Sequence, residues 1–467
     1  MPVPRDDDLP LRGARWAGPG RVVPAAAAAA VLACASRALV FPALSSNDEA
    51  AHVDYAAAVW HGRLPVFEQG LTTTPGFGEI PDAQWVAQHP PLFYTVLAPA
   101  VGPLVDGGHY LAAVLAGRFV NSLLAGLAVL AVAWAVRQAA PRDPWLPAAS
   151  AVVTALCAWV LRVGGAVYND VLGVVVASVV LGLAARIARD GPSPRRYAAL
   201  AAAGAAALAT RASLVVVVGV ALAGVVLSAG VRTRAVRPTA LAALTAAGIG
   251  LGAVLPTAWF WLRNVRLTGN VLGSHPEWAA ENLDRVGRSW LDVLGDPGFW
   301  WQTWGLFSHN VESLVPVTVL LLLVPVLAAA AARVRGRARR PVDPAGRVVA
   351  ALFAVAVVGV ALLAVAFTTT GGGINPRYVM PVLAPVSLAV AAGLRARPGA
   401  ALAALATWCA VAVADAAAGY ARAVGEYLHL PGVPPIWPVP ALLLGVTAVA
   451  CIAGAVAGMR SVASATR

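Results

Sequence analysis

Apolar runs of membrane-spanning length recur along almost the whole chain. A soluble core cannot absorb them, because 59% of the residues are hydrophobic and only 12% are charged. A membrane β-barrel would instead show short segments of alternating polarity. We therefore predict an all-α, polytopic integral membrane protein with about twelve transmembrane helices, in a single transmembrane domain over residues 1-467. The spans are expected at 22-44, 115-136, 146-164, 170-188, 212-229, 238-260, 312-332, 347-367, 378-394, 399-418 and 437-458, with a shorter one near 196-210.

Clusters of arginine between the apolar runs orient the chain. The formal net charge is +12, and every basic residue is Arg. The clusters occupy alternate connections, as the positive-inside rule requires. We therefore expect a multi-pass protein of the cytoplasmic (inner) membrane with both termini cytoplasmic, in contact with membrane lipid and without a nucleic-acid partner. The clusters are Arg12/Arg15/Arg21, Arg137/Arg142, Arg186/Arg189/Arg195/Arg196, Arg232/Arg234/Arg237, Arg333 to Arg347, Arg395/Arg397 and Arg460/Arg467.

Two long connections fall on the outer side, and long irregular loops tend to carry function. The first outer loop, 45-114, contains "HPPLFYTVLAPAVGPL" (89-104), which is short and broken by proline. This segment is expected to lie along the outer interface, because a crossing here would reverse the arginine pattern that follows. The second outer loop, 261-311, is rich in Trp, Asp and Glu. Its aromatic residues suit either an interfacial belt or a binding surface.

The stretch "SSNDEAAHVDY" (45-55) places two adjacent acids at the start of an amphipathic helix in the first outer loop. Asp48, His52 and Tyr55 share one helix face, at i, i+4 and i+7. The S-x-x-E spacing that ends at Glu49 is that of a capping box, which offers a purely structural role for the acids. The alternative is that Asp48 or Glu49 is a catalytic base at the membrane surface. The local sequence leaves both roles open.

Further motifs follow this acidic pair. The amphipathic helix ends in "HGRLP", then come "QHPPLFY" and "AGRFVNSL", which places Arg118 at the start of the second span. Together these features resemble the first outer loop of the GT-C superfamily of membrane glycosyltransferases, which includes protein O-mannosyltransferases and lipid A aminoarabinose transferases. The resemblance continues more weakly through "VYNDVLG", "ATRASL", "WLRNVRLTGNVLG" and "GGINPRYVMPVLAPVSLAVAAGL", and so covers most of the chain.

The resemblance implies a transferase that takes a sugar from a polyprenyl-phosphate donor. The acceptor would be a cell-envelope glycan, lipid or protein at the outer face of the cytoplasmic membrane. Asp48, with Glu49 beside it, matches the acid that takes the proton of the acceptor hydroxyl. Direct displacement by that hydroxyl would invert the anomeric carbon. The lipid phosphate would leave without the second carboxylic acid that glycoside hydrolases need.

The leaving phosphate requires fixed positive charge, and three arginines are candidates for binding it. Arg377 follows the Gly-rich turn "TTTGGGINPRY", whose glycines allow the backbone to approach a ligand closely, and its guanidinium can bind phosphate in a bidentate manner. Its alternative role is to anchor a helix at the interface. Arg211 interrupts two apolar runs, so it either joins the phosphate site or pairs with Asp170 or another buried acid. Arg118 is assigned to the phosphate site through the family pattern alone.

The other candidates line the acceptor site or its cavity. Asn169 and Asp170 fall at the second outer turn, where helix capping is the alternative role. The Pro-Pro that follows His89 also marks a sharp turn. A divalent cation bound by His89 with Asp48 or Glu49 is left open, and no cofactor or metal ligand is assigned. The acceptor or cavity-lining candidates are His52, Tyr55, His89, Asn169, Asp170 and Tyr378.

Two other functional classes remain as alternatives. One is a transporter or flippase for a lipid-linked substrate, and the other is a relative that retains the fold without catalysis. Transporters usually bind their substrate near the membrane midplane through broken helices. The polar residues of this chain gather at one face instead, which favours transfer over transport.

Overall fold

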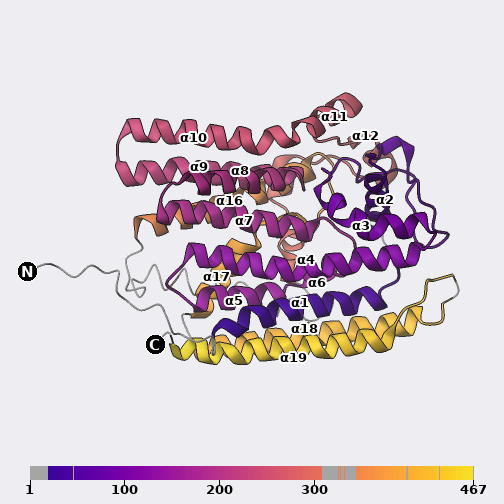
Figure 1. The fold of residues 1–467 in the computed structure, drawn as a ribbon. Coiled ribbons are helices and arrows are strands. Elements are labelled where there is room, and N and C mark those ends of the chain that lie inside the picture. The colour runs from indigo at the N-terminus through magenta and orange to yellow at the C-terminus, as the bar shows by residue number, and fades with distance from the viewer. Residues whose placement is uncertain are drawn as a thin grey trace, which may run out of the picture.

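The computed structural model describes residues 19–45, 47–307, 343–395, 398–430 and 432–465, with isolated positions between 324 and 331. Across these residues the chain is helical and contains no strand. Long helices run side by side and form an elongated bundle, with α9 and α10 along one edge and α18 and α19 along the opposite edge (Figure 1). This architecture confirms the prediction of an all-α, multi-pass membrane protein.

The described helices fall into two groups, those of the bundle and those of its connections. The bundle helices are α1 (Pro19–Val40), α4 (Tyr110–Ala139), α5 (Trp145–Ala155), α6 (Ala158–Gly164), α7 (Asp170–Asp190), α8 (Pro194–Leu208), α9 (Val215–Thr233), α10 (Val236–Val254), α11 (Ala258–Thr268), α16 (Pro344–Thr369), α17 (Leu383–Arg395), α18 (Pro398–Tyr427) and α19 (Pro438–Ala465). The connections contain α2 (Asn47–Trp60), α3 (Leu92–Asp106), α12 (Pro276–Leu283), α13 (Trp290–Leu294) and α14 (Pro297–Thr303). Short 3₁₀ helices are η2 (Phe67–Gln69), η3 (Ala212–Leu214), η4 (Leu255–Thr257), η5 (Gly305–Phe307) and η7 (Pro376–Val382).

Nine described helices are long and apolar enough to cross a membrane, or ten if the bent pair α5–α6 counts as one span. The expected count of about twelve is therefore not reached within the described residues. The shorter run expected near 196-210 becomes α8, which has only 15 residues. The span expected at 312-332 lies almost wholly outside the described residues.

The helices differ from the expected ranges at two places. The span expected at 146-164 is two helices bent by 57°, because Cys157 between them has an extended backbone with ψ of 114°. α10, η4 and α11 form one apolar helical run that continues to Thr268, so residues 261-268 of the expected second outer loop are helical.

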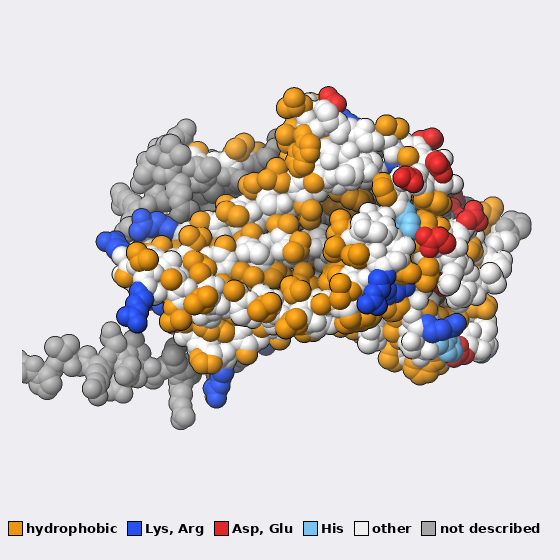
Figure 2. All heavy atoms as spheres, turned by 90° about the horizontal axis from the view of Figure 1, so that it is seen from above, with side chains coloured by type: hydrophobic (Ala, Val, Ile, Leu, Met, Phe, Trp, Pro, Cys, Tyr) orange, Lys and Arg blue, Asp and Glu red, His pale blue; other side chains and the backbone are white. Residues whose placement is uncertain are grey.

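One end of the bundle gathers the arginines of the alternate connections. Arg189 donates to the carbonyl of Ala139 at the end of α4 (2.7 Å), and Arg232 donates to the carbonyl of Ala188 near the end of α7 (2.7 Å). Both described chain ends lie on this side (Figure 1). Between this end and the opposite one, a broad band of the surface is apolar, and nearly all visible acidic side chains lie beyond that band (Figure 2). This distribution is that of a membrane-embedded bundle with two distinct aqueous ends.

The opposite end carries α2 and α3, the two α-helices of the first connection (Figure 1). α3 has 15 residues and contains Pro99 and Pro103. It does not carry the chain across, because α4 starts again beside the end of α1, where Arg118 donates to the carbonyl of Phe41 (2.7 Å). The expectation that 89-104 does not cross is therefore confirmed.

Small residues allow the long helices to pack closely. Gly126 of α4 faces α1, where an added Cβ would overlap Val31. Gly182 of α7 faces α4, where an added Cβ would overlap the ring of Trp134. In a membrane such small-residue contacts bring helix backbones together where lipid supplies little hydrophobic driving force. They hold α1, α4 and α7 in the fixed frame that supports the polar end.

Candidate functional site

An ion pair between Asp48 and Arg377 forms the centre of the polar end. Asp48 lies in the first turn of α2, and Arg377 lies in η7, whose start is capped by the side chain of Asn375. The Arg377 Nη1 atom donates to Asp48 Oδ2 at 2.7 Å. The side chain of Asp48 is 26% exposed and that of Arg377 is 20% exposed, so a ligand can reach both of them. The structure thus joins two predicted site residues that are 329 positions apart.

Two tyrosines surround the Arg377 guanidinium. Its Cζ atom lies 5.4 Å from the ring centroid of Tyr168 and 5.5 Å from that of Tyr378. These contacts hold the planar guanidinium in place while leaving its N–H groups for other partners. The buried Nε atom of Arg377 has no hydrogen-bond partner among the described residues. Arg377 therefore retains donor capacity for a ligand.

Glu49 points elsewhere and forms a buried pair with Arg118. Arg118 donates to both carboxylate oxygens, at 2.8 and 2.6 Å, and both side chains are at most 2% exposed. Glu49 also accepts from the backbone N–H groups of Leu44 and Val167, each at 3.0 Å. The Glu49 carboxylate thus ties together the segments after α1, before α7 and within α4. Ser46, the proposed partner in the capping box, lies outside the described residues.

A second buried pair links Arg211 to Asp170, one of the two alternatives considered for that arginine. Arg211 also donates to the side-chain oxygen of Asn169 at 3.0 Å. Asn169 precedes α7, but its side chain does not cap the helix. Asp170 Oδ2 and Asn169 Nδ2 are buried and lack partners within the described part of the chain. Buried polar atoms of this kind mark a place for water or a polar ligand.

His52, Tyr55 and His89 form an aromatic wall with Tyr94, behind the Asp48–Arg377 pair. His52 Nδ1 lies 3.0 Å from the Tyr94 hydroxyl, and the rings of Tyr55 and Tyr94 stack with centroids 3.6 Å apart. The Tyr55 hydroxyl donates to the backbone carbonyl of His89 at 2.9 Å. Tyr168 links the wall to Arg377, since its ring centroid is 5.4 Å from that of His52.

Both histidines of this wall are neutral. Burial lowers the pKa of His52 well below its ordinary 6.5, and the charges of Arg377 and Arg211 lower that pKa further. The pKa of His89 is likewise well below 6.5, first because of burial and then because of Arg211 and His52. A neutral imidazole can donate or accept a hydrogen bond but adds no positive charge. The cationic groups of the site are therefore its arginines.

Asp54 is an organising residue that sequence reasoning missed. It is fully buried, and its Oδ1 accepts four hydrogen bonds, from the backbone and side chain of Thr72 and of Thr73. Its Oδ2 accepts from the side chain of Gln84 at 2.7 Å. Asp54 thereby folds the segment 62–89 against α2. The available signal was an acid in the middle of the amphipathic helix, between Val53 and Tyr55.

The other residues near α2 give no cation site. Among the described residues, no group of three or more His, Cys, Asp or Glu side chains could hold a metal ion.

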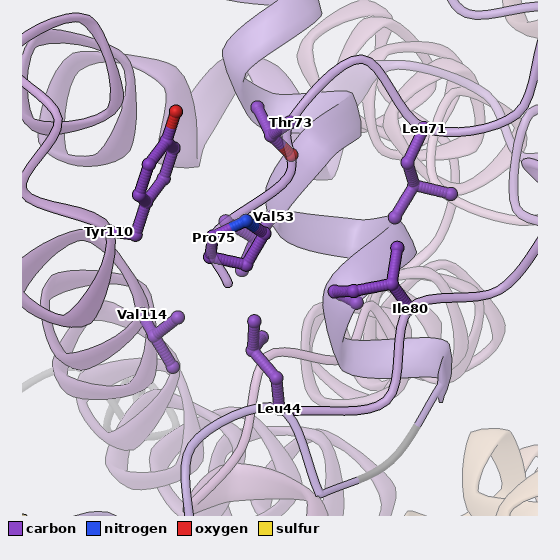
Figure 3. A pocket seen from close by; sticks show the side chains of 9 residues that line it. Leu44, Val53, Leu71, Thr73, Pro75, Ile80, Tyr110 and Val114 are labelled. Atoms are coloured by element: carbon purple, nitrogen blue, oxygen red, sulfur yellow. The ribbon is translucent and has the colours of Figure 1, made fainter. Parts of the chain in front are cut away.

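An apolar pocket lies beside α2, where Val53, Leu71 and Tyr110 are among its lining residues (Figure 3). Val53 is on the helix face opposite Asp48, so this pocket is separate from the ion pair.

Fold and site together define the class of this protein: a multi-pass helical membrane protein with an accessible Asp–Arg pair and an aromatic wall at one aqueous end. No protein-family model and no curated protein matches the sequence. The chain is similar to the solved structure of ArnT from Cupriavidus metallidurans bound to undecaprenyl phosphate, with 18% identity and a TM-score of 0.49 over 93% of this chain and 74% of that one. It is also similar to the Archaeoglobus fulgidus oligosaccharyltransferase, with 14% identity and a TM-score of 0.49 over 86% of this chain.

The chain spans about half the length of the archaeal protein, 52% of it. A structure of that protein, AglB, in complex with an inhibitory peptide and a dolichol-phosphate matches with 12% identity and a TM-score of 0.48, over 93% of this chain and 55% of that one. ArnT and AglB are both membrane glycosyltransferases of the GT-C superfamily.

Proposed function

We propose that this protein is a GT-C-type glycosyltransferase, which moves a sugar from a polyprenyl-phosphate donor to a cell-envelope acceptor. The observation that carries the proposal is the partly exposed pair of Asp48 and Arg377, since Asp48 lies on α2 at the end of the bundle opposite the arginine-rich connections (Figure 1). That end would face outward from the cytoplasmic membrane, with both termini in the cytoplasm. The first-loop motifs support the same assignment.

The reaction uses Asp48 as the base. The acceptor hydroxyl oxygen attacks the anomeric carbon of the donor sugar while its proton passes to Asp48. The bond between that carbon and the phosphate oxygen breaks, and polyprenyl phosphate leaves with the electron pair. Because the displacement is direct, the anomeric configuration inverts. Between the two adjacent acids, the accessible Asp48 suits this role better than Glu49, whose oxygens are occupied and buried.

Arg377 would bind the phosphate and so control the base. When no polyprenyl-phosphate donor is bound, the Arg377 guanidinium contacts Asp48 at 2.7 Å and neutralises the negative charge of its carboxylate. A phosphate offers a stronger partner, and the Nε of Arg377, which has no partner in the described segments, can join its Nη atoms in a bidentate contact. Movement of Arg377 toward the phosphate releases Asp48 for the acceptor hydroxyl. Donor binding would thus precede activation of the acceptor.

The second pair, Asp170 and Arg211, supplies contacts to the sugar. Asp170 Oδ2 and Asn169 Nδ2 are buried there and have no partner in the part of the chain that the structure describes, and they would bind hydroxyl groups of the transferred sugar. Arg118 would act on the reaction indirectly. Its hydrogen bonds go to the Glu49 carboxylate and to backbone carbonyls at the end of α1 and just after it. Tyr378 would lie beside the phosphate, whereas His52 and Tyr55 are buried and would support the site from behind.

A reconstituted transfer assay tests the proposal. Purified protein in liposomes is supplied with radiolabelled polyprenyl-phosphate sugars and a cell-envelope extract, and transfer is followed by scintillation counting. We expect transfer by the wild type, its loss in Asp48→Asn, and its retention in Glu79→Gln, a control at an exposed acid of the same loop. Translocation of the donor without transfer would favour a flippase, and wild-type activity in Asp48→Asn would exclude the proposed base.

A further inference from the structure

A short helix in the second long connection, α13, presents apolar side chains at the surface. Trp290 is 49% exposed, Leu291 is 81% exposed and Leu294 is 41% exposed. At 100° per residue these three side chains share one side of the helix, and Asp292 lies on nearly the opposite side. We call Trp290, Leu291 and Leu294 the α13 surface. Exposed apolar groups that cluster in this way mark an interaction surface.

The remaining apolar residue of α13 fixes the helix to the end of a membrane span. Val293 is fully buried and forms a small core with Phe299 of α14 and with Ala364 and Val365 of α16. Both α16 residues belong to the last two turns of that helix. The position of α13 along the bundle is therefore set by its packing on α16.

The position of Val365 gives the depth of α13 in the membrane. The uncharged run of α16 from Val348 to Phe367 is about 30 Å long at a rise of 1.5 Å per residue, which matches the hydrocarbon core of a bilayer. Val365 comes just before the end of this run, so it lies at the edge of the hydrocarbon core on the side of the polar end. α13 is thus placed at the boundary between acyl chains and headgroups.

The surface of α16 at this level is also apolar. Leu362 is 46% exposed and Phe367 is 42% exposed, and both belong to the turns on which α13 packs. Exposed side chains at this depth are surrounded by lipid rather than by water. Tryptophan is enriched at the level of the headgroups, where Trp290 lies. The occupant that fits the α13 surface is therefore the bilayer itself.

The chain just before α13 is joined to the turn that leads to Arg377. The backbone N–H of Arg288 donates to the carbonyl of Thr369 at 3.2 Å. Gly371 approaches this part of the chain so closely that an added Cβ would lie 2.7 Å from the carbonyl oxygen of Arg285. An anchor at α13 therefore acts on a segment that contacts the Gly-rich turn before Arg377.

We propose that the α13 surface inserts into the bilayer leaflet at the polar end, so that α13 is an interfacial anchor whose partner is the lipid surface. Its apolar face enters the boundary between headgroups and acyl chains by about 5–10 Å. Two roles were open for the aromatic residues of 261-311, and this inference assigns the interfacial role to α13. It does not depend on the proposed transfer reaction.

Spin labels on the full chain in lipid nanodiscs test the proposal. Cys409→Ala and Cys451→Ala are introduced first, because these two cysteines are only half-buried. Single labels are then attached at Leu291→Cys and at Leu294→Cys, two probes of the same face. Glu281→Cys is the matched control, at an exposed acid of α12 in the same connection. Collisions of each label are measured with oxygen, which concentrates in the bilayer, and with a nickel complex that stays in water.

We expect the ratio of oxygen to nickel accessibility to be severalfold higher for the labels at 291 and 294 than for the control at 281. The thermal unfolding of each labelled variant should equal that of the unlabelled protein, because all three positions are exposed. Labels at 291 and 294 that meet the nickel complex as often as the control does would show that α13 faces water. Labels that neither reagent reaches would show that protein covers α13. Either result would overturn the proposal.

Discussion

Asp48 and Glu49 are neighbours in the sequence, but each has an arginine partner of its own. Consecutive residues of a helix point about 100° apart, so one carboxylate reaches Arg377 and the other reaches Arg118. The sequence predicted a functional acid here but could not choose between the two. The choice depends on Arg377, which is 329 positions away and is positioned by a separate span.

The Glu49–Arg118 pair should contribute to stability far more than the Asp48–Arg377 pair. Arg118→Met leaves an uncompensated buried carboxylate, so the free energy of unfolding should fall by about 3–5 kcal/mol. Asp48→Asn breaks a partly exposed pair and should cost at most about 1 kcal/mol. Unfolding in mixed micelles, followed by tryptophan fluorescence, measures both. Arg63→Met is the control, at an exposed arginine of the first loop. Equal stability of Arg118→Met and this control would refute the structural role.

Neutral His52 makes stability depend on pH in a defined window. The pKa of the folded state is well below 6.5, so the unfolded state binds a proton below pH 6.5 that the folded state does not. Stability should therefore fall as the pH drops below 6.5, by up to about 1.4 kcal/mol per pH unit for this histidine. His52→Gln removes one of the two buried histidines and should reduce the slope, measured as the melting temperature against pH, while His89 retains its own contribution. An unchanged slope in that variant would contradict a buried neutral His52.

At the scale of elements, periodicity predicted the helices that surround the site. The amphipathic helix expected at the acidic pair matches α2, and the segment predicted to lie along the interface, 89-104, overlaps most of α3. The break between α5 and α6 could not be predicted, because a hydropathy window does not register one extended residue at Cys157. The fold of 62–89 was also missed, since it depends on hydrogen bonds that Asp54 accepts from residues up to 30 positions away.

Asp54 should control the order of the segment 62–89. Asp54→Ala removes all five side-chain hydrogen bonds that this carboxylate accepts from the segment. Because each bond to a charged group contributes about 1.5–3 kcal/mol, cleavage of the segment by proteinase K should accelerate by at least about tenfold. Asp82→Ala, at an exposed acid of the same segment, should be cleaved at the wild-type rate. Equal cleavage of both variants would mean that other contacts hold the segment.

At the scale of the whole molecule, the alternation of arginine clusters correctly predicted a bundle with two chemically different ends. It did not predict which spans touch. α19, the last described helix, packs along α1, the first. The site combines α2, α7 and η7. Such contacts depend on side-chain packing between remote segments, and a single sequence carries no direct signal for them.

The orientation in the membrane is a separate prediction. Glu79 lies in the first outer loop and Arg234 lies between α9 and α10, and both side chains are exposed. Glu79→Cys should react with a membrane-impermeant maleimide in intact cells, whereas Arg234→Cys should react only after lysis. The wild type provides the background, which would come from the half-buried Cys409 and Cys451, since Cys34 and Cys157 are buried. The reverse labelling pattern would place the site in the cytoplasm.

The central claim is that the Asp48–Arg377 pair divides into a base and a phosphate ligand. The most direct test measures donor binding and single-turnover transfer separately in Asp48→Asn and Arg377→Gln. Asp48→Asn should bind the polyprenyl-phosphate sugar at least as tightly as the wild type but transfer it about 10²–10⁴-fold more slowly. Arg377→Gln should bind that donor about ten- to a hundredfold more weakly. Wild-type transfer by Asp48→Asn, or wild-type donor affinity in Arg377→Gln, would contradict the account.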